Sequence, residues 1–267
     1  MNISTEDLLM TMAGMTTTTT TTATTAMTAT TAMTATTATT TGDAAKRHLE
    51  SLHAFSTAMW PMAIQCFLQD NPIFIKYGIP EVPSGPKYKC PLKLFCYLIT
   101  FQALHHKVCE AIWAKLVNLM NKRMFDNGLF NIDYWNPEIV YSFTHEELYG
   151  RNGVGLSKRK IEAIRNIALY LQEHPLIFDP NMDSLVIIKD ISKSVKGIGP
   201  FVVQHFLKEQ GRLDIITHND LVFRRGLQKV LQLEKVLTVA QSKRLTKKAW
   251  PRFQTIGTMY CFHIAHL

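Results

Sequence analysis

The stretch that decides the fold reads VKGIGPFVVQHFLKEQGRLDIITHNDLVFRRG and occupies residues 195–226. Gly197 and Gly199 stand between two apolar-periodic runs, a pattern that predicts a tight hairpin joining two helices. Glycines let an anion approach the backbone, and the free N–H groups at the start of the second helix point toward it. Further along, Asp220 precedes another helical run and is placed to cap its N-terminus. The stretch therefore predicts an anion-binding hairpin followed by a single carboxylate.

Five blocks of the chain resemble a known family in the same order and spacing. They are KGIGPF at residues 196–201, NDLVFRRGL at 219–227, LITFQALHHKVCEAIWAKL at 98–116, GLSKRKIEAIRNIA at 155–168 and WPR at 250–252. On these blocks residues 48–267 resemble the helix-hairpin-helix (HhH-GPD) DNA glycosylases, in the branch that excises alkylated purines such as 3-methyladenine. The resemblance implies an all-α, two-lobed fold with duplex DNA in the cleft.

Composition is compatible with that partner but does not prove it. The 267 residues include 29 Lys and Arg against 21 Asp and Glu, a net charge of +8. This balance suits a polyanion, and it equally suits a basic protein with a solvated surface. No apolar run reaches the roughly eighteen residues of a membrane span, so we expect no membrane partner. The resemblance implies a monomer, and DNA as the partner makes the nucleus the expected location.

The N-terminal part has a different composition from the rest. Residues 15–41 are almost wholly Thr, Ala and Met, which cannot build a packed core. We therefore predict that residues 1–43 form a disordered, low-complexity tail and that residues 44–267 form the two helical lobes of a glycosylase domain. A transit peptide is the alternative for the tail, disfavoured because no Lys or Arg occurs before Lys46.

Local signals predict where several elements begin and end. Asp70 is a candidate N-cap with Pro72 in the first turn, Thr144 with Glu147 forms a capping box, and Ser157 is placed to cap a helix. The expected elements are a proline-rich loop at residues 78–91, helices at 92–101, 105–119 and 158–171, and a loop at 121–141.

Asp220 is the catalytic aspartate that the resemblance implies. A purine methylated at N3 or N7 is cationic and already a fair leaving group, so one carboxylate suffices to stabilise the developing oxocarbenium sugar or to orient water. The alternative role for Asp220 is a helix cap alone. The five cysteines and ten histidines lack metal-ligand spacing, so we expect no cofactor, no metal and no iron–sulfur cluster. A monovalent cation on the hairpin carbonyls is compatible with the resemblance.

The resemblance also implies a base pocket lined by Phe201, His205 and Phe262. Bifunctional relatives carry a lysine nucleophile at the position of Phe201, so we predict a monofunctional enzyme without lyase activity. An aromatic ring there stacks on a cationic base with about 0.5 to 2 kcal/mol of attraction. The alternative is three core aromatics at helical spacing.

Three segments are expected to contact DNA. By resemblance, the hairpin grips a phosphate, Gln102 enters the minor groove, and Ala103 or Leu104 fills the gap left by a flipped nucleotide. Three cations after Ser157 oppose the helix macrodipole, which favours a nearby phosphate. The alternatives are an ordinary turn between core helices and a solvated basic face. The expected contacts are Lys196, Gly197, Ile198, Gly199, Gln102, Ala103, Leu104, Ser157, Lys158, Arg159 and Lys160.

These features predict a monofunctional DNA glycosylase that hydrolyses the N-glycosidic bond of alkylated purines of the 3-methyladenine and 7-methylguanine type in double-stranded DNA. His218 and Asn219 depart from the residues that many relatives carry before the aspartate, which leaves the substrate range open. The alternatives are a glycosylase for oxidised or deaminated bases and a non-catalytic DNA-binding module.

Overall fold

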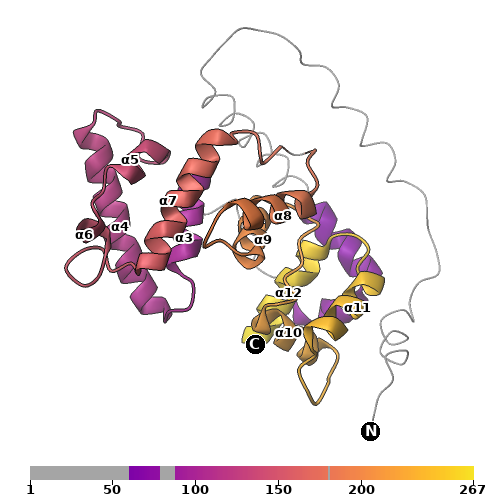
Figure 1. The fold of residues 1–267 in the computed structure, drawn as a ribbon. Coiled ribbons are helices and arrows are strands. Elements are labelled where there is room, and N and C mark those ends of the chain that lie inside the picture. Colours follow the sequence, from indigo (N-terminus) through magenta and orange to yellow (C-terminus); the bar gives the residue numbers. More distant parts are fainter. Residues whose placement is uncertain (1–59, 79–87, 180) are drawn as a thin grey trace, which may run out of the picture.

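The computed structural model describes residues 60–78, 88–179 and 181–267 (Figure 1). The predicted tail, residues 1–43, lies outside the described residues. Within them, every regular element is a helix and no strand forms. The all-α class expected from the sequence is confirmed. The described helices include none long and apolar enough to cross a membrane.

The described helices follow one another through short connections. Residues 60–70 form the first described helix. The elements after it are η1 (Pro72–Tyr77), α3 (Pro91–Thr100), α4 (His106–Asp126), α5 (Pro137–Tyr141), α6 (His145–Leu148), α7 (Lys158–Glu173), α8 (Ser184–Ser194), α9 (Pro200–Glu209), α10 (Leu221–Val230), α11 (Val239–Ala249) and α12 (Gln254–His266).

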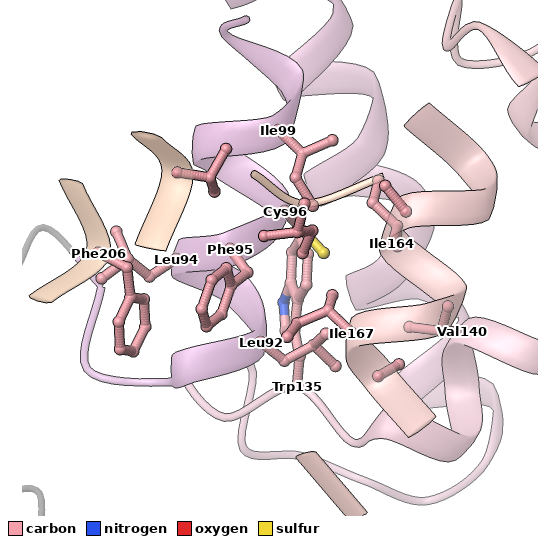
Figure 2. Close-up of a cluster of buried hydrophobic side chains, with 14 of the residues drawn as sticks. Leu92, Leu94, Phe95, Cys96, Ile99, Trp135, Val140, Ile164, Ile167 and Phe206 are labelled. Carbon is pink, nitrogen blue, oxygen red and sulfur yellow. The ribbon is translucent and has the colours of Figure 1, made fainter. Parts of the chain in front are cut away.

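Two hydrophobic cores define two lobes. The first, here called the middle core, is built from buried residues between Cys90 and Ile215 on helices α3 to α9. Figure 2 shows part of it, with Phe95 of α3 and Phe206 of α9 next to each other. Their rings stack at 4.2 Å between centroids, and such a pair adds about 0.5–1.5 kcal/mol to area burial. This core fixes α9, which carries two of the expected site residues, Phe201 and His205, against α3.

The second, here called the terminal core, joins the two ends of the described chain. It combines residues 60–74 with residues 223–264. Phe67 and Phe74 pack on Trp250 and Tyr260, with all four ring pairs at 5.3–5.8 Å. The chain thus enters the terminal core, leaves it to build the middle core, and returns after residue 220.

The predicted caps are present at three helix starts. The capping box of Thr144 and Glu147 begins α6, and the Ser157 side chain accepts a hydrogen bond from the Lys160 backbone N–H at the start of α7. Asp220 caps α10 through the Val222 N–H at 2.7 Å. Each such cap contributes about 1 kcal/mol to stability, because the side chain accepts a hydrogen bond from a backbone N–H that has no partner within the helix.

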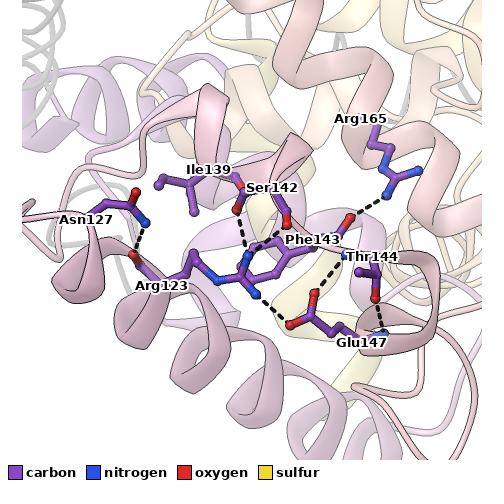
Figure 3. A network of polar contacts seen from close by, with 8 residues as sticks. All are labelled: Arg123, Asn127, Ile139, Ser142, Phe143, Thr144, Glu147 and Arg165. Carbon is purple, nitrogen blue, oxygen red and sulfur yellow. Dashed lines mark hydrogen bonds and ion pairs between the residues drawn. The ribbon is translucent and has the colours of Figure 1, made fainter.

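The expectation of a loop at residues 121–141 is wrong in part. Helix α4 continues to Asp126, because Met120 and Met124 extend its buried stripe, and α5 begins after the side-chain cap of Asn136. Arg123 explains the extra turn of α4, since it bonds the Ser142 carbonyl and the Glu147 carboxylate (Figure 3).

Two further boundaries differ from the expected ones. The helix at residues 60–70 runs through Asp70, whose carboxylate lies 3.8 Å from the guanidinium of Arg252. Asn71 precedes η1 instead, and its side chain donates to the Phe67 carbonyl at 3.0 Å. Pro91 begins α3 rather than ending a loop, because proline is well tolerated at the first helical position.

Gly226→Ala should destabilise the protein strongly, because helices α10 and α12 touch there. A Cβ on Gly226 would collide with the Cys261 carbonyl and lie 2.7 Å from its Cα. Overpacking of this kind costs about 3 kcal/mol, which corresponds to a loss of roughly 6–12 °C in Tm. The control is Gly199→Ala, where a Cβ meets nothing within 4 Å. Equal melting temperatures for the two variants in calorimetry would contradict this packing.

Candidate functional site

The predicted hairpin joins α8 to α9 at residues 195–199. Gly197 has φ +93°, a conformation that L side chains rarely adopt, and a Cβ there would lie 2.9 Å from the Cβ of Ala163 on α7. Ile198 is buried, while Lys196, Gly197 and Gly199 are exposed. Backbone and lysine therefore face solvent together, and Ile198 anchors the turn in the middle core.

The N-terminus of α9 is open to an anion. Its N-cap is Gly199, no side chain caps it, and Pro200 occupies the first turn. Unpaired N–H groups and the positive end of the macrodipole favour negative charge at such a site. The structure therefore places the exposed Lys196 near a helix end that is itself suited to a phosphate. The monovalent cation stays a prediction.

The turn after α3 has an unusual backbone. Ala103 adopts φ +55°, which is uncommon for a residue with a Cβ and costs on the order of 1 kcal/mol. Leu104 follows it with 45% of its surface exposed. An exposed leucine beside a strained residue gives this turn an apolar tip.

A cavity of about 980 Å³ joins the turn, the start of α7 and the hairpin helix. It is as large as the largest small-molecule sites, which span about 300–1,000 Å³. Nine of the predicted site residues line it, namely Gln102, Ala103, Leu104, Ser157, Arg159, Lys160, Gly197, Phe201 and His205. Tyr97, Phe101 and Glu209 also contribute to the wall. Residues far apart in sequence thus converge on one aromatic-lined space.

Asp220 lies behind the cavity wall, against His205. Its Oδ2 is 3.6 Å from Nε2 of His205, an ion-pair distance beyond that of a hydrogen bond, and the two side chains are only 12% and 18% exposed. Burial opposes the charged carboxylate, but the His205 imidazole and the Val222 N–H together hold the pKa of Asp220 below its ordinary value. Burial also lowers the pKa of His205, despite the neighbouring carboxylate. At neutral pH the pair is therefore a charged aspartate beside a neutral imidazole.

The three predicted pocket aromatics form a row. The ring of Phe201 lies 4.4 Å from that of His205, which in turn lies 6.0 Å from that of Phe262. Phe201 is 39% exposed and lines the cavity. Phe262 does not line the cavity and instead packs at the edge of the terminal core.

The three consecutive cations of α7 have different surroundings. Lys158 and Arg159 are exposed at the helix start. Lys160 is partly buried, and its ammonium donates to the carbonyls of Thr100 and Gln102 at 2.7 and 2.9 Å. The sequence pattern does not distinguish the three. In the structure Lys158 and Arg159 are exposed, with the Lys158 ammonium 5.7 Å from the ring centroid of Tyr149, whereas Lys160 is hydrogen-bonded to two backbone carbonyls.

Sequence reasoning missed Lys208, a buried lysine close to Asp220. Its ammonium lies 3.8 Å from the Glu209 carboxylate and 4.9 Å from the ring centroid of Phe262. Burial lowers the pKa of Lys208, although the carboxylates of Glu209 and Asp220 oppose the shift. A helical wheel would have placed it near His205, three residues earlier on the same face of α9.

His218 was also missed as a structural contact. Its Nε2 lies 2.8 Å from Oγ1 of Thr246, which connects the turn before Asp220 to α11. Burial, together with the charge of Lys243, lowers the pKa of His218 to about 4. The neutral ring therefore helps to hold the Asp220 turn in place.

Comparison with known proteins identifies the family. The model described as "HhH-GPD superfamily base excision DNA repair protein" matches residues 97–252, more than half of the chain. The chain therefore belongs to the HhH-GPD superfamily of base excision DNA repair proteins. No curated protein sequence matches it.

Three solved structures share the fold. The 3-methyladenine DNA glycosylase of Schizosaccharomyces pombe, solved in complex with abasic DNA, is 22% identical with a TM-score of 0.57, over 73% of this chain and 90% of its own. The Bacillus halodurans DNA-3-methyladenine glycosidase is 21% identical with a TM-score of 0.58, over 76% and 88%. The Archaeoglobus fulgidus 3-methyladenine DNA glycosylase is 19% identical with a TM-score of 0.55, over 84% and 75%.

The low pKa of His218 makes stability depend on pH. The unfolded state takes up a proton near pH 6.5 and the folded state only near pH 4, so the stability contributed by neutral His218 is present above pH 6.5 and is lost as pH falls toward 4. Unfolding of the wild type in urea at pH 7 and pH 5 should therefore show a loss of stability at pH 5. His218→Gln, which removes the titrating ring, should show a smaller loss. Identical pH dependence in the two proteins would contradict the assignment.

Proposed function

We propose that the protein is a monofunctional DNA glycosylase that removes alkylated purines from double-stranded DNA and acts as a monomer in the nucleus. The observation that carries this proposal is a charged Asp220, only 12% exposed, at the junction of the two cores, behind an aromatic-lined cavity that also includes Gly197 of the hairpin. The similarity to three 3-methyladenine DNA glycosylases supports the choice of substrate.

DNA binding is proposed to begin on the backbone. Lys196 and the open end of α9 take one phosphate, and the exposed Lys158 and Arg159 take another. The turn at Gln102 to Leu104 then occupies the space that the flipped nucleotide leaves. Leu104 is the better wedge because its exposed side chain is larger than that of Ala103.

The chemistry follows from the charge states in the site. A purine alkylated at N3 or N7 carries a positive charge and leaves without protonation, so the neutral His205 need not act as an acid. As the glycosidic bond breaks, the charge of Asp220, behind His205, stabilises the positive charge that develops on the sugar. Water then adds to the sugar carbon from which the base has left, and its proton passes to solvent. The Oδ1 of Asp220 is held by the cap bond, so the carboxylate needs no reorganisation during the reaction. Phe201 offers a ring face to the cationic base.

Asp220→Asn tests the catalytic role against the capping role. Asparagine caps helices as well as aspartate does, so folding should survive while the charge is lost. We expect release of 7-methylguanine from methylated duplex DNA to fall at least about a hundredfold, with little change in binding to an abasic-site analogue. Circular dichroism and the melting temperature serve as controls. Excision at the wild-type rate would reduce Asp220 to a cap.

Absence of lyase activity is tested by borohydride trapping. With Phe201 in place of a lysine, no imine should form and the products should be intact strands bearing abasic sites. Lys208 is the competing nucleophile, because it is buried near Asp220 with a lowered pKa. A trapped protein–DNA band that disappears in Lys208→Arg would overturn the monofunctional assignment.

A further inference from the structure

The ammonium of Lys160 is bonded to the protein interior, whereas the neighbouring Lys158 and Arg159 are exposed. The ammonium donates to the carbonyls of Thr100 and Gln102, which lie 60 and 58 residues earlier in the sequence. Thr100 is the last residue of α3, and Gln102 is the second residue after it. Both hydrogen bonds are of ordinary length, and the ammonium is partly buried. Two of its three donors are therefore directed into the protein at the α3–α4 turn.

One of the two acceptors, the Thr100 carbonyl, belongs to the last turn of α3. The last four carbonyls of a helix receive no hydrogen bond from a backbone N–H of the same helix, and the negative end of the macrodipole lies there. The last turn of α3 carries no basic residue of its own. Lys160 therefore supplies from α7 the positive charge that the C-terminus of α3 lacks.

The same bonds brace a strained segment. Gln102 immediately precedes Ala103 with φ +55°, and Leu104 then projects with 45% of its surface exposed. A left-handed alanine costs on the order of 1 kcal/mol and persists only where the surroundings hold it. Lys160 bonds the carbonyl of Gln102, the residue directly before the strained Ala103. Lys160, Gln102, Ala103 and Leu104 all line the same cavity.

We propose that Lys160 is a positioning residue, which locks the α3–α4 turn in the conformation that presents Leu104 to DNA, rather than a phosphate contact. This inference deepens the proposed function and rests on it for the role of the turn. Lys158 and Arg159, which are exposed beside it, remain the phosphate contacts of this helix end. Through these two hydrogen bonds, Lys160 holds the α3–α4 turn against α7.

The test compares Lys160→Met with Lys158→Met on duplex DNA that carries a tetrahydrofuran abasic analogue next to 2-aminopurine. Methionine keeps the length of the side chain and removes its charge and donors. Binding is measured at several salt concentrations, and 2-aminopurine fluorescence at saturating protein reports unstacking by the turn. Neither readout requires excision, so a wild type that unstacks the DNA but releases no alkylated base refutes the proposed function alone.

Lys160→Met should leave the slope of log K against log salt at the wild-type value and should lose at least half of the fluorescence increase. Lys158→Met should lower the magnitude of the slope by about 0.9, as expected for one lost phosphate contact, and keep the fluorescence increase. A positioning role is overturned if Lys160→Met lowers the slope like Lys158→Met and retains full fluorescence. It is also overturned if the variant changes neither quantity, or if the wild type gives no fluorescence increase.

A second variant keeps the inference testable if Lys160→Met does not fold. Ala103→Val leaves Lys160 and the core in place and disfavours the observed conformation at the exposed residue 103, since a β-branched residue rarely adopts φ +55°. We expect it to reduce the fluorescence increase with an unchanged salt slope. Full fluorescence in Ala103→Val would show that the conformation of the turn is irrelevant to unstacking and would overturn the proposal.

Discussion

The close contact between Gly197 and Ala163 is the constraint on which the site depends. A Cβ at residue 197 would lie 2.9 Å from the Ala163 Cβ and 3.3 Å from its Cα, so the hairpin lies directly on α7. Lys160 is three residues earlier on that helix, and residues so spaced share a face. One face of α7 therefore holds the hairpin and, through Lys160, the α3–α4 turn. The hairpin and the turn keep a fixed separation because both are attached to a single helix.

Asp220 is held in place because it lies on the segment that connects the middle core to the terminal core. Ile215 belongs to the middle core and Phe223 to the terminal core, so the segment between them is fixed at both ends. The cap bond from Val222 engages Oδ1, and Oδ2 is left facing His205. The requirement to satisfy the N-terminus of α10 and the requirement for an oriented charge are thus met by one side chain. The cap is compatible with the proposed catalytic role, since it leaves Oδ2 without a bond to the α10 backbone.

Local patterns predicted much of this arrangement. The hairpin glycines, the Asp220 cap, the Ser157 cap and the capping box of Thr144 depend on residues close in sequence, so the sequence alone identifies them. The family resemblance correctly predicted the two-lobed fold, and the structure brings nine of the predicted site residues to one cavity.

The misses have a common physical cause, which is tertiary contact. The extra turn of α4 depends on Arg123 meeting Glu147, and the placement of Asp70 depends on where the terminal core extends the first described helix. Lys160 looks identical to Lys158 in sequence, because nothing local shows that the C-terminus of α3 lies within its reach. Lys208 was detectable by helical spacing, but its burial was not, since that follows from packing beside Phe262.

The distribution of charge around the cavity is compatible with the cationic base proposed as its occupant. Arg159 and Lys160 both line the cavity, and two free cations there would repel the substrate. Lys160, however, directs its ammonium to two carbonyls, and Lys208 is paired with Glu209. Because His205 is neutral and Asp220 is charged, the lobe junction behind the cavity carries an uncompensated negative charge. Positive charge is thus exposed at the surface, while the carboxylate that is proposed to stabilise the sugar is nearly enclosed, where water screens it least.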